Sequence, residues 1–548
     1  MRAPVTSATG FVGSALADHV LANGHHREAD RSGHEASPDS DFVGDVVTDF
    51  VAAARDFPHR PAIVHDGAAI TYHDLAERVR LTASRYRARH IAANGPSKLI
   101  GAVVSHTPAV AEHLLGILQA GATYCPVDAA LPAARQQAIG AVLGLEHLTA
   151  VAADPLEPTA LGVETLDRDP GSADEALPQS IWQRTDPAYV LCTSGSTGAP
   201  KPVVVSRHAL TVTVRALRHL FALTPDDRIL QFASLGWDTC LEEILPALTA
   251  GATLVFDKEA HSGSFPRFVR MLEEREVTVL DLPTAFWHEL VYFLDEGHTA
   301  LPDSVRLVVI GGERVDPTRL RQWRDLDTGQ VSLLNTYGCT ETTMITHAVQ
   351  LAGPGIEPEA TSTDAEAPIG RPLPHVLDHV TDEGELLVAG PALATEYLDL
   401  TDITAAAFPV ADHGFGPTRW FRTGDLVTRG EDGLLHSRGR ADEQVKVAGV
   451  RVHPAEVEVQ LNTHPAVTGA VVLGERVLGR TALTAYIVAT EPTTPADLKR
   501  YLRERLPSQF VPTQVKFVTA LTYTSTGKVD RAATQRAAAD YDSKGTSQ

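Results

Sequence analysis

The chain has 548 residues, a formal net charge of −22 and 43% hydrophobic residues. This length exceeds one ordinary hydrophobic core, so we expect two or three packed units in a soluble globular protein. The negative charge argues against a nucleic-acid partner, because it would repel a phosphate backbone. No apolar stretch reaches the roughly 18 to 20 residues that span a bilayer, so we expect a cytoplasmic chain with no membrane partner.

The cysteines lie far apart in the sequence and form no Cys-x-x-Cys pair; they are Cys125, Cys192, Cys240 and Cys339. Such spacing favours free thiols in a reducing compartment. It gives no zinc-binding framework, so we expect neither a disulfide nor a structural zinc site.

Residues 1–47 are predicted to be an extension that precedes the folded units. Residues 6–13 resemble the phosphate-binding turn of extended short-chain dehydrogenases, and residues 25–45 form a polar stretch without periodicity, typical of a linker. A dinucleotide site needs three glycines and a complete strand-turn-helix-strand unit, whereas Ser7 stands at the first glycine position. A nicotinamide-dependent oxidoreductase is therefore a minor alternative.

Two regions of different texture follow the extension. Residues 48–438 alternate short β-branched or apolar runs with helical patterns, which predicts an α/β domain of layered, largely parallel sheets. From Gly439 the pattern changes, and residues 439–548 are predicted to form a small α+β domain. Within it we expect a helix at residues 495–506, with Pro495 in the first turn and Thr494 as its cap.

A loop rich in small and hydroxylated residues spans residues 191–201 after a predicted strand. Its backbone N–H groups and hydroxyls can surround phosphate oxygens, and a lysine adds a positive charge. The spacing differs from that of a Walker loop, and such a stretch alone is also typical of a linker. The candidate phosphate-binding residues are Thr193, Ser194, Gly195, Ser196, Thr197, Gly198 and Lys201.

Six segments in a fixed order resemble those of the adenylate-forming superfamily, specifically the adenylation domains of nonribosomal peptide synthetases. They are residues 118–128, 191–201, 335–343, 421–426, 439–446 and 525–531, and the likeness runs from Thr48 to Ala532. It implies a large α/β domain of layered sheets and helices followed by a small mobile α+β domain. It also implies ATP-dependent activation of a carboxylic acid as an acyl adenylate, with release of pyrophosphate.

The resemblance assigns the residues that would manage charge in this reaction. A carboxylate and ATP are both anions, so the site needs magnesium and fixed cations to offset their repulsion. By resemblance Glu341, beside Thr340, holds Mg²⁺, and Lys528 bridges the acyl carboxylate and the α-phosphate. Without the motif, Lys528 would be interpreted as a solvated lysine near a chain end.

Three further residues are implied to hold the nucleoside. Asp425 would accept hydrogen bonds from the ribose hydroxyls, because a carboxylate offers only acceptors. Tyr337 would stack on adenine, and Arg440 would contact the nucleotide. Taken alone, Gly424 and Asp425 are also typical of a hairpin turn.

Asp442 matches the hinge of the family, at which the small domain turns after adenylation. The turn would withdraw Lys528 and bring Lys446 toward a thiol acceptor, and a few backbone dihedrals suffice for such a motion. The sequence after Arg531 lacks the surroundings of a phosphopantetheine attachment site. We therefore expect a free-standing enzyme whose acceptor is a phosphopantetheine thiol on a separate carrier protein or synthetase.

The matching segments also give a substrate pocket: Asp238, Thr239, Glu242, Asp281, Val309, Gly311, Thr336, Met344 and Ile345, closed by Lys528. Asp238 is the expected partner of an amino acid's ammonium group. Two further acids, Glu242 and Asp281, would be costly inside a pocket unless a second cation meets them. We therefore expect a diamino acid: β-lysine first, then lysine or ornithine. In the alternative, Glu242 turns to solvent and Asp281 caps a helix.

Two other functions remain open. The same fold serves acyl-coenzyme A ligases for aryl or fatty acids, against which Asp238 argues, since such pockets usually lack an acid for ammonium. A non-catalytic nucleotide-binding regulator would bind ATP without catalysing pyrophosphate exchange.

Overall fold

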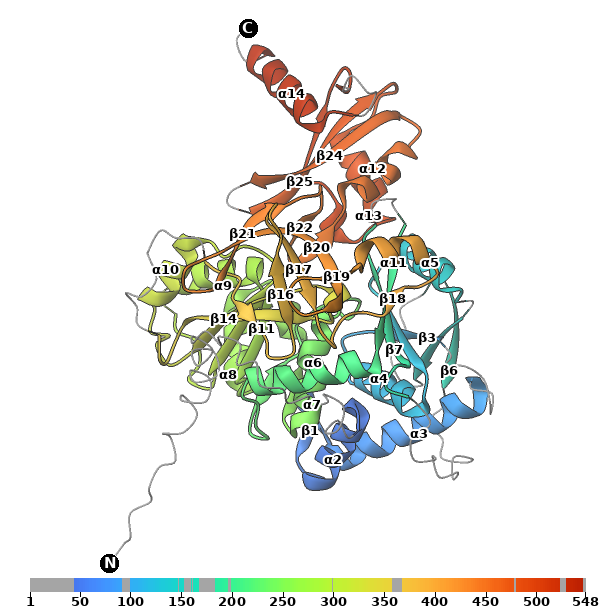
Figure 1. Ribbon diagram of the computed structural model, residues 1–548, viewed down its shortest axis with the longest axis vertical. Coiled ribbons are helices and arrows are strands. Elements are labelled where there is room, and N and C mark those ends of the chain that lie inside the picture. Colours follow the sequence, from blue (N-terminus) through green and yellow to red (C-terminus); the bar gives the residue numbers. More distant parts are fainter. Residues whose placement is uncertain are drawn as a thin grey trace, which may run out of the picture.

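The computed structural model describes residues 44–90, 99–145, 147–151, 159, 161–166, 183–195, 199–297, 299–356, 367–477, 480–522 and 529–545. Four predictions fall wholly or mostly outside these ranges: the dehydrogenase-like turn at residues 6–13, the linker up to residue 43, the loop residues Ser196, Thr197 and Gly198, and Lys528. The described chain is mixed α/β, with a large N-terminal domain and a smaller C-terminal domain, drawn at the top of Figure 1. This agrees with the fold class expected from the sequence.

One layer of the large domain is a nine-stranded sheet in the order β15-β14-β13-β12-β11-β9-β10-β1-β2. The strands from β13 to β1 are parallel, and β14, β15 and β2 add to the sheet in antiparallel pairs. The strands are β1 (Pro61–His65), β2 (Ala68–Thr71), β9 (Arg228–Leu230), β10 (Thr253–Phe256), β11 (Val279–Pro283), β12 (Leu307–Gly311), β13 (Ser332–Gly338), β14 (Ile345–Ala352) and β15 (Arg371–Pro372).

A second layer is a seven-stranded sheet in the order β18-β8-β7-β4-β3-β5-β6. The five strands β7, β4, β3, β5 and β6 are parallel to one another, and β8 and β18 extend the sheet in antiparallel pairs. The strands are β3 (Leu99–Val104), β4 (Thr123–Asp128), β5 (His147–Val151), β6 (Gly162–Leu166), β7 (Pro187–Thr193), β8 (Lys201–Ser206) and β18 (Glu396–Tyr397).

Helices pack between the two sheets and on their outer faces. The largest hydrophobic core joins residues of both sheets with those of α4, α6 and α7, and a second core packs α8, α9 and α10 on the other face of the nine-stranded sheet. The helices are α2 (Val46–Asp56), α3 (Tyr72–His90), α4 (Ala109–Ala120), α5 (Ala133–Leu143), α6 (Arg207–Leu220), α7 (Thr239–Ala250), α8 (Phe265–Glu274), α9 (Thr284–Gly297), α10 (Pro317–Asp325) and α11 (Thr401–Ala407), with short 3-10 turns η2 (Lys258–His261) and η3 (Thr340–Thr342).

A five-stranded antiparallel sheet leads from the large domain toward the small one (Figure 1). Its strands are β16 (Leu377–Val380), β17 (Glu385–Ala389), β19 (Val410–Asp412), β20 (Pro417–Arg429) and β21 (Leu435–Arg440). Because β21 pairs with β20 as far as Arg440, the change of texture expected at Gly439 falls inside a strand.

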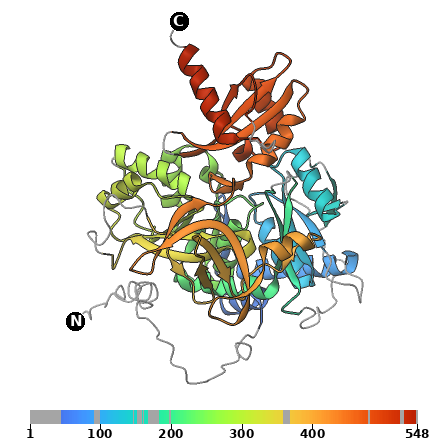
Figure 2. The same cartoon turned by 45° about the horizontal axis from the view of Figure 1, so that its top comes forward.

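The small domain combines a hairpin, a three-stranded sheet and helices around its own core. Figure 2 shows it resting on the large domain. Its elements are β22 (Val445–Val447), β23 (Val450–Val452), α12 (Pro454–Asn462), β24 (Val467–Val477), β25 (Arg480–Ala489), α13 (Pro495–Arg503), η4 (Ser508–Phe510), β26 (Gln514–Phe517) and α14 (Arg531–Gly545). The predicted helix at residues 495–506 begins at Pro495 as expected, because Thr494 accepts the Asp497 N–H and caps it, but it ends at Arg503.

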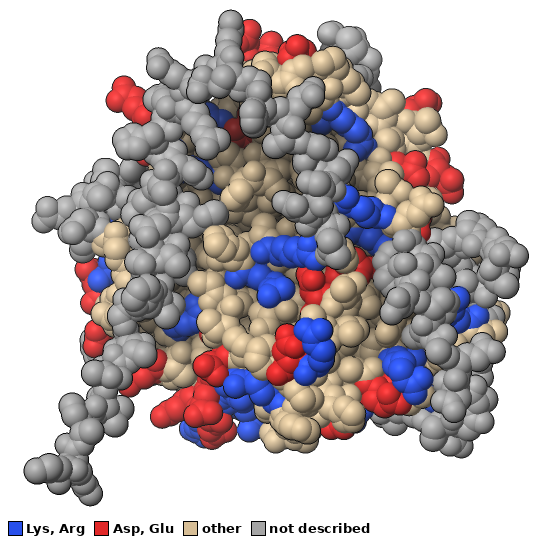
Figure 3. Space-filling view, turned by 60° about the horizontal axis from the view of Figure 1, so that its bottom comes forward, with Lys and Arg blue, Asp and Glu red and all other residues tan. Residues whose placement is uncertain are grey.

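The structure also shows the cysteines, the apolar character of the helices and the charges on one face. Each of the four cysteines is free. Among the described residues, no helix has both the length and the apolar character needed to cross a membrane. On the face drawn in Figure 3, basic and acidic side chains lie interspersed.

Candidate functional site

Two adjoining cavities lie where β11, β12 and β13 end beneath the small domain. The carboxyl ends of parallel strands are the usual place for ligands in α/β folds. The interdomain cavity has a volume of about 500 Å³, and the inner cavity about 450 Å³. Gly312, Thr336 and Lys446 line both cavities, so the two adjoin at these residues.

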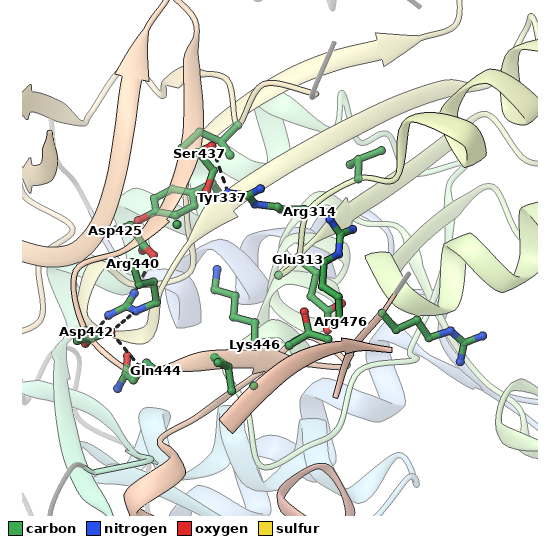
Figure 4. A pocket seen from close by; sticks show the side chains of 18 of the residues that line it. Glu313, Arg314, Tyr337, Asp425, Ser437, Arg440, Asp442, Gln444, Lys446 and Arg476 are labelled. Atoms are coloured by element: carbon green, nitrogen blue, oxygen red, sulfur yellow. Dashed lines mark hydrogen bonds and ion pairs between the residues drawn. The ribbon is translucent and has the colours of Figure 1, made fainter. Parts of the chain in front are cut away.

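The interdomain cavity brings together the residues expected to hold the nucleoside. Figure 4 shows Tyr337, Asp425, Arg440 and Lys446 around it, from β13, β20, β21 and β22. The Tyr337 hydroxyl donates to Asp425 Oδ2 at 2.6 Å, and Arg440 Nη1 donates to Asp425 Oδ1 at 2.7 Å. Arg440 also donates to both carboxylate oxygens of Asp442, at 2.5 and 2.8 Å. The predicted hinge residue is therefore tied to the nucleoside residues.

Charge keeps the Asp425 carboxylate ionised. Burial opposes its ionisation, but the positive charges of Lys446, Arg440 and Arg451 outweigh burial and hold its pKa below the usual value. Burial lowers the pKa of the Lys446 ammonium, although Asp425 acts in the opposite direction. The Lys446 Nζ lies 5.3 Å from the centroid of the Tyr337 ring.

Arg451, on β23 of the small domain, reaches into the same region. Its Nη1 donates to Glu341 Oε2 at 3.2 Å, and its Nη2 lies 3.7 Å from Asp425 Oδ2. Burial opposes ionisation of Glu341, but the charges of Arg451 and Lys201 hold its pKa below the usual value. The Tyr397 hydroxyl donates to Glu341 Oε1 at 2.9 Å. Arg451 thus links the carboxylates expected to hold magnesium and ribose.

The motifs did not single out Arg451, although the sequence carries a signal for it. In residues 445–452, valines flank Lys446 and Arg451, and Ala448 and Gly449 form a turn between the two halves. Both turn residues have positive φ, of 49° and 80°, as the tight turns of two-residue hairpins require. The resulting β22–β23 register pairs Lys446 with Arg451, so the two cations lie side by side.

The described part of the phosphate-loop candidate lies against the small domain. Thr193 and Lys201 pair across β7 and β8, and the Ser194 hydroxyl donates to the Arg451 carbonyl oxygen at 2.9 Å. A Cβ at Gly195 would lie 2.3 Å from the Ala199 carbonyl oxygen, so only glycine fits there. Lys201 Nζ lies 5.1 Å from the Tyr397 ring centroid, near the Glu341 carboxylate that Tyr397 contacts.

The inner cavity gathers most of the predicted substrate residues. It is lined by Asp238, Thr239, Glu242, Asp281, Gly311, Thr336, Met344 and Ile345, together with Thr340. Val309 differs, because its side chain belongs to the core between the sheets and is fully buried. Gly311, at the end of the same strand, lines the cavity; a Cβ there would lie 2.6 Å from Thr336 Oγ1.

Three carboxyl groups of this cavity have raised pKa values. Burial raises the pKa of Asp238 to about 6, and its Oδ2 has no hydrogen-bond partner among the described residues. Glu242 on α7 and Asp281 on β11 lie close enough to shift each other's pKa. Burial raises the pKa of Asp281 to about 7, and burial with the Asp281 charge raises that of Glu242 well above its usual value. The alternative in which Glu242 turns to solvent and Asp281 caps a helix is wrong, since Glu242 is buried and Asp281 lies inside β11.

Comparisons with known proteins place this arrangement in a family. The family model described as AMP-binding enzyme matches residues 50–398, and that of the AMP-binding enzyme C-terminal domain matches residues 456–528. The chain is 39% identical over 486 residues to an isonitrile lipopeptide synthase of Streptomyces coeruleorubidus, covering 87% of this chain and 32% of the relative. It is 32% identical over 494 residues to tyrocidine synthase 3 of Brevibacillus parabrevis, covering 87% of this chain and 7% of the relative.

Solved structures agree with this placement. An artificially fused adenylation–PCP di-domain from Klebsiella oxytoca superposes with a TM-score of 0.75 at 25% identity, covering 87% of this chain and 94% of that one. The chain spans a third or less of the length of the two curated synthases. By family model, sequence and fold, the chain belongs to the AMP-binding enzyme family and is of the adenylate-forming type found in the adenylation domains of nonribosomal peptide synthetases.

Proposed function

We propose that this AMP-binding enzyme activates a diamino acid with ATP as an aminoacyl adenylate and then passes the acyl group to a thiol. The single observation that carries the substrate class is the Glu242–Asp281 carboxyl pair in the inner cavity. Among the described residues, no lysine or arginine forms an ion pair with either acid. An ammonium group of the substrate would supply the missing charge, and Asp238 would hold the other one.

The residues of the interdomain cavity fit ATP. Asp425 is an ionised acceptor suited to ribose hydroxyls, and the Tyr337 ring offers a face for adenine. The N–H groups at Arg451 Nε and Nη2 are buried without a hydrogen-bond partner among the described residues, which suits a phosphate group. Glu341, with its lowered pKa, is the carboxylate that would hold Mg²⁺, which when bound offsets the negative charge of the phosphates.

In the first step a carboxylate oxygen of the amino acid attacks the α-phosphorus, and the bond from phosphorus to pyrophosphate breaks. Lys201, whose charge lowers the pKa of Glu341, would offset the charge of the phosphates, and Lys528 would bridge the two reactants as the family motif implies. In the second step a thiolate attacks the acyl carbon and AMP leaves. The proposed acceptor is the phosphopantetheine thiol of a carrier protein or synthetase in trans, brought by a turn of the small domain at Asp442.

A second candidate shares the first step. A malonyl-CoA ligase superposes with a TM-score of 0.71 at 27% identity, covering 84% of this chain, which supports an acyl-coenzyme A ligase as the alternative. Asp238 and the carboxyl pair disfavour it, because an acyl chain without an amine would leave three buried acids without a cation.

Pyrophosphate exchange into ATP tests the proposal with a panel of lysine, β-lysine, ornithine, norleucine and malonate. We expect exchange with the diamino acids, loss of exchange in Lys528→Ala, and no loss in the control Lys499→Ala, an exposed lysine of the small domain. Exchange with norleucine but with no diamino acid contradicts the substrate class. Exchange only with acids that lack an amine favours the ligase for coenzyme A.

A further inference from the structure

The inner cavity has a wall of rings that the predicted pocket did not include. His106, His261, Phe232 and Phe286 line it together with Glu242 and Asp281. The ring centroids of His106 and His261 are 4.5 Å apart, and Phe232 lies 5.1 Å from His261 and 4.7 Å from Phe286. Two imidazole rings therefore share the cavity with the carboxyl pair.

The neighbouring acids Glu242 and Glu243 have different partners. Glu243 accepts the backbone N–H groups of Phe232 and Ala233, at 3.0 and 2.9 Å, and Gln231 Nε2 at 3.0 Å. Three donors thus satisfy Glu243 and anchor the segment that follows β9. Glu242 is left to face Asp281 in the cavity.

The same anchor fixes the orientation of His106. Gln231 Nε2 donates to Glu243 and to the Ala233 carbonyl oxygen at 2.7 Å, so Gln231 Oε1 is the atom 2.7 Å from His106 Nδ1. An amide oxygen only accepts, so Nδ1 carries the proton. In the neutral ring Nε2 is then an acceptor.

We propose that His106 is a specificity-determining residue whose Nε2 accepts a hydrogen bond from the distal ammonium of the substrate, with Gln231 as its positioning residue. The proposal rests on the diamino acid function proposed above. An ammonium group has three N–H donors. Glu242, Asp281 and His106 supply three acceptors of the same cavity for them.

Kinetics of pyrophosphate exchange with lysine and with norleucine, which lacks the side-chain amine, test this role. We expect His106→Phe, which keeps a ring and removes both nitrogens, to raise the KM for lysine about tenfold. The KM for ATP and the KM for norleucine should stay unchanged. His106→Gln, which keeps a polar group near the Nε2 position, should restore part of the loss. His65→Phe, on β1 outside the cavity, is the matched control.

Gln231→Leu tests the positioning step. Without the amide, the His106 ring is no longer held in one tautomer, so the KM for lysine should rise while kcat and the KM for ATP stay the same. The thermal unfolding midpoint of each variant, compared with that of the wild type, shows whether the variant still folds.

The outcomes separate the two proposals. Equal KM values for lysine in the wild type and a folded His106→Phe variant overturn the role of His106 and leave the diamino acid substrate intact. A wild-type enzyme that activates only amino acids with one amine overturns both.

Discussion

At the scale of single residues, buried acids in and beside the two cavities have pKa values shifted in opposite directions. Asp425 and Glu341 face Arg451, and their pKa values lie below the usual range in spite of burial. Asp281 and Glu242 face each other, and their pKa values lie above it. Burial acts to raise the pKa of all four acids; nearby cations outweigh it at Asp425 and Glu341, whereas burial prevails at Asp281 and Glu242.

This difference predicts how substrate binding depends on pH. An acid with a raised pKa in the empty cavity must lose its proton before it can pair with an ammonium, so binding of a diamino acid should strengthen as pH rises through the raised pKa values of about 6 for Asp238 and about 7 for Asp281. We expect the KM for lysine to fall between about pH 6 and about pH 8, below the pKa of its side-chain amine. Exchange rates at several pH values measure this.

A KM for lysine that stays flat or rises over that range would contradict the proposal that the carboxyl pair must lose a proton before it binds an ammonium group. The KM for ATP serves as the internal control, because Asp425 and Glu341 are ionised throughout the range.

At the scale of elements, the β22–β23 hairpin joins the domains through a glycine contact. Gly312, after β12, has a φ of 87°, and a Cβ built there would lie 3.0 Å from the Gly449 Cα. The Gly449 N–H donates to Glu313 Oε1 at 2.8 Å. Two residues without side chains therefore let the hairpin reach both cavities with Lys446 and Arg451.

Gly312→Ala should impair thiol transfer more than adenylation. The added Cβ meets the hairpin only when the small domain holds the present orientation, which places Lys446 and Arg451 in the site. Pyrophosphate exchange and acyl transfer to a phosphopantetheine thiol, measured separately, give the two rates.

Gly414→Ala is the matched control, since Gly414 also has a positive φ, of 94°, but open space around it. If both variants slow both steps equally, backbone strain rather than the interdomain contact is responsible.

Local signals in the sequence predicted secondary-structure elements better than they predicted contacts between distant residues. The start of α13 and the separate small domain follow from capping and texture, which act within a few residues. The contact of Arg451 with Glu341, 110 residues away, depends on how the domains pack and could not be predicted from either segment alone. Val309 was placed in the pocket by motif matching, but it alternates into the core between the sheets.

At the scale of the whole molecule, a buried ion pair links the domains. Arg135 on α5 donates to Glu456 on α12, and both side chains are almost fully buried. Burial raises the pKa of Glu456, and the charge of Arg135 acts in the opposite direction. The ion pair thus joins the large domain and the small domain.

Glu456→Gln should loosen the small domain. The variant keeps the size of the side chain and leaves the Arg135 charge buried without its partner, at a cost of roughly 3 kcal/mol. We expect faster limited proteolysis around residues 441–444 than in the wild type. Glu504→Gln, which breaks an exposed pair with Arg505 in the same domain, should leave the rate unchanged. Equal rates of proteolysis in the two variants would show that the ion pair does not hold the small domain in place.

The central claim is that the carboxyl pair of the inner cavity selects a second ammonium group. The most direct test is the ratio of kcat/KM for lysine to that for norleucine in pyrophosphate exchange, in the wild type and in the double variant Glu242→Gln/Asp281→Asn. We predict that the ratio falls at least about a hundredfold in the variant, because each charged hydrogen bond contributes roughly 1.5 to 3 kcal/mol. An unchanged ratio, with both proteins folded and active, would contradict the claim.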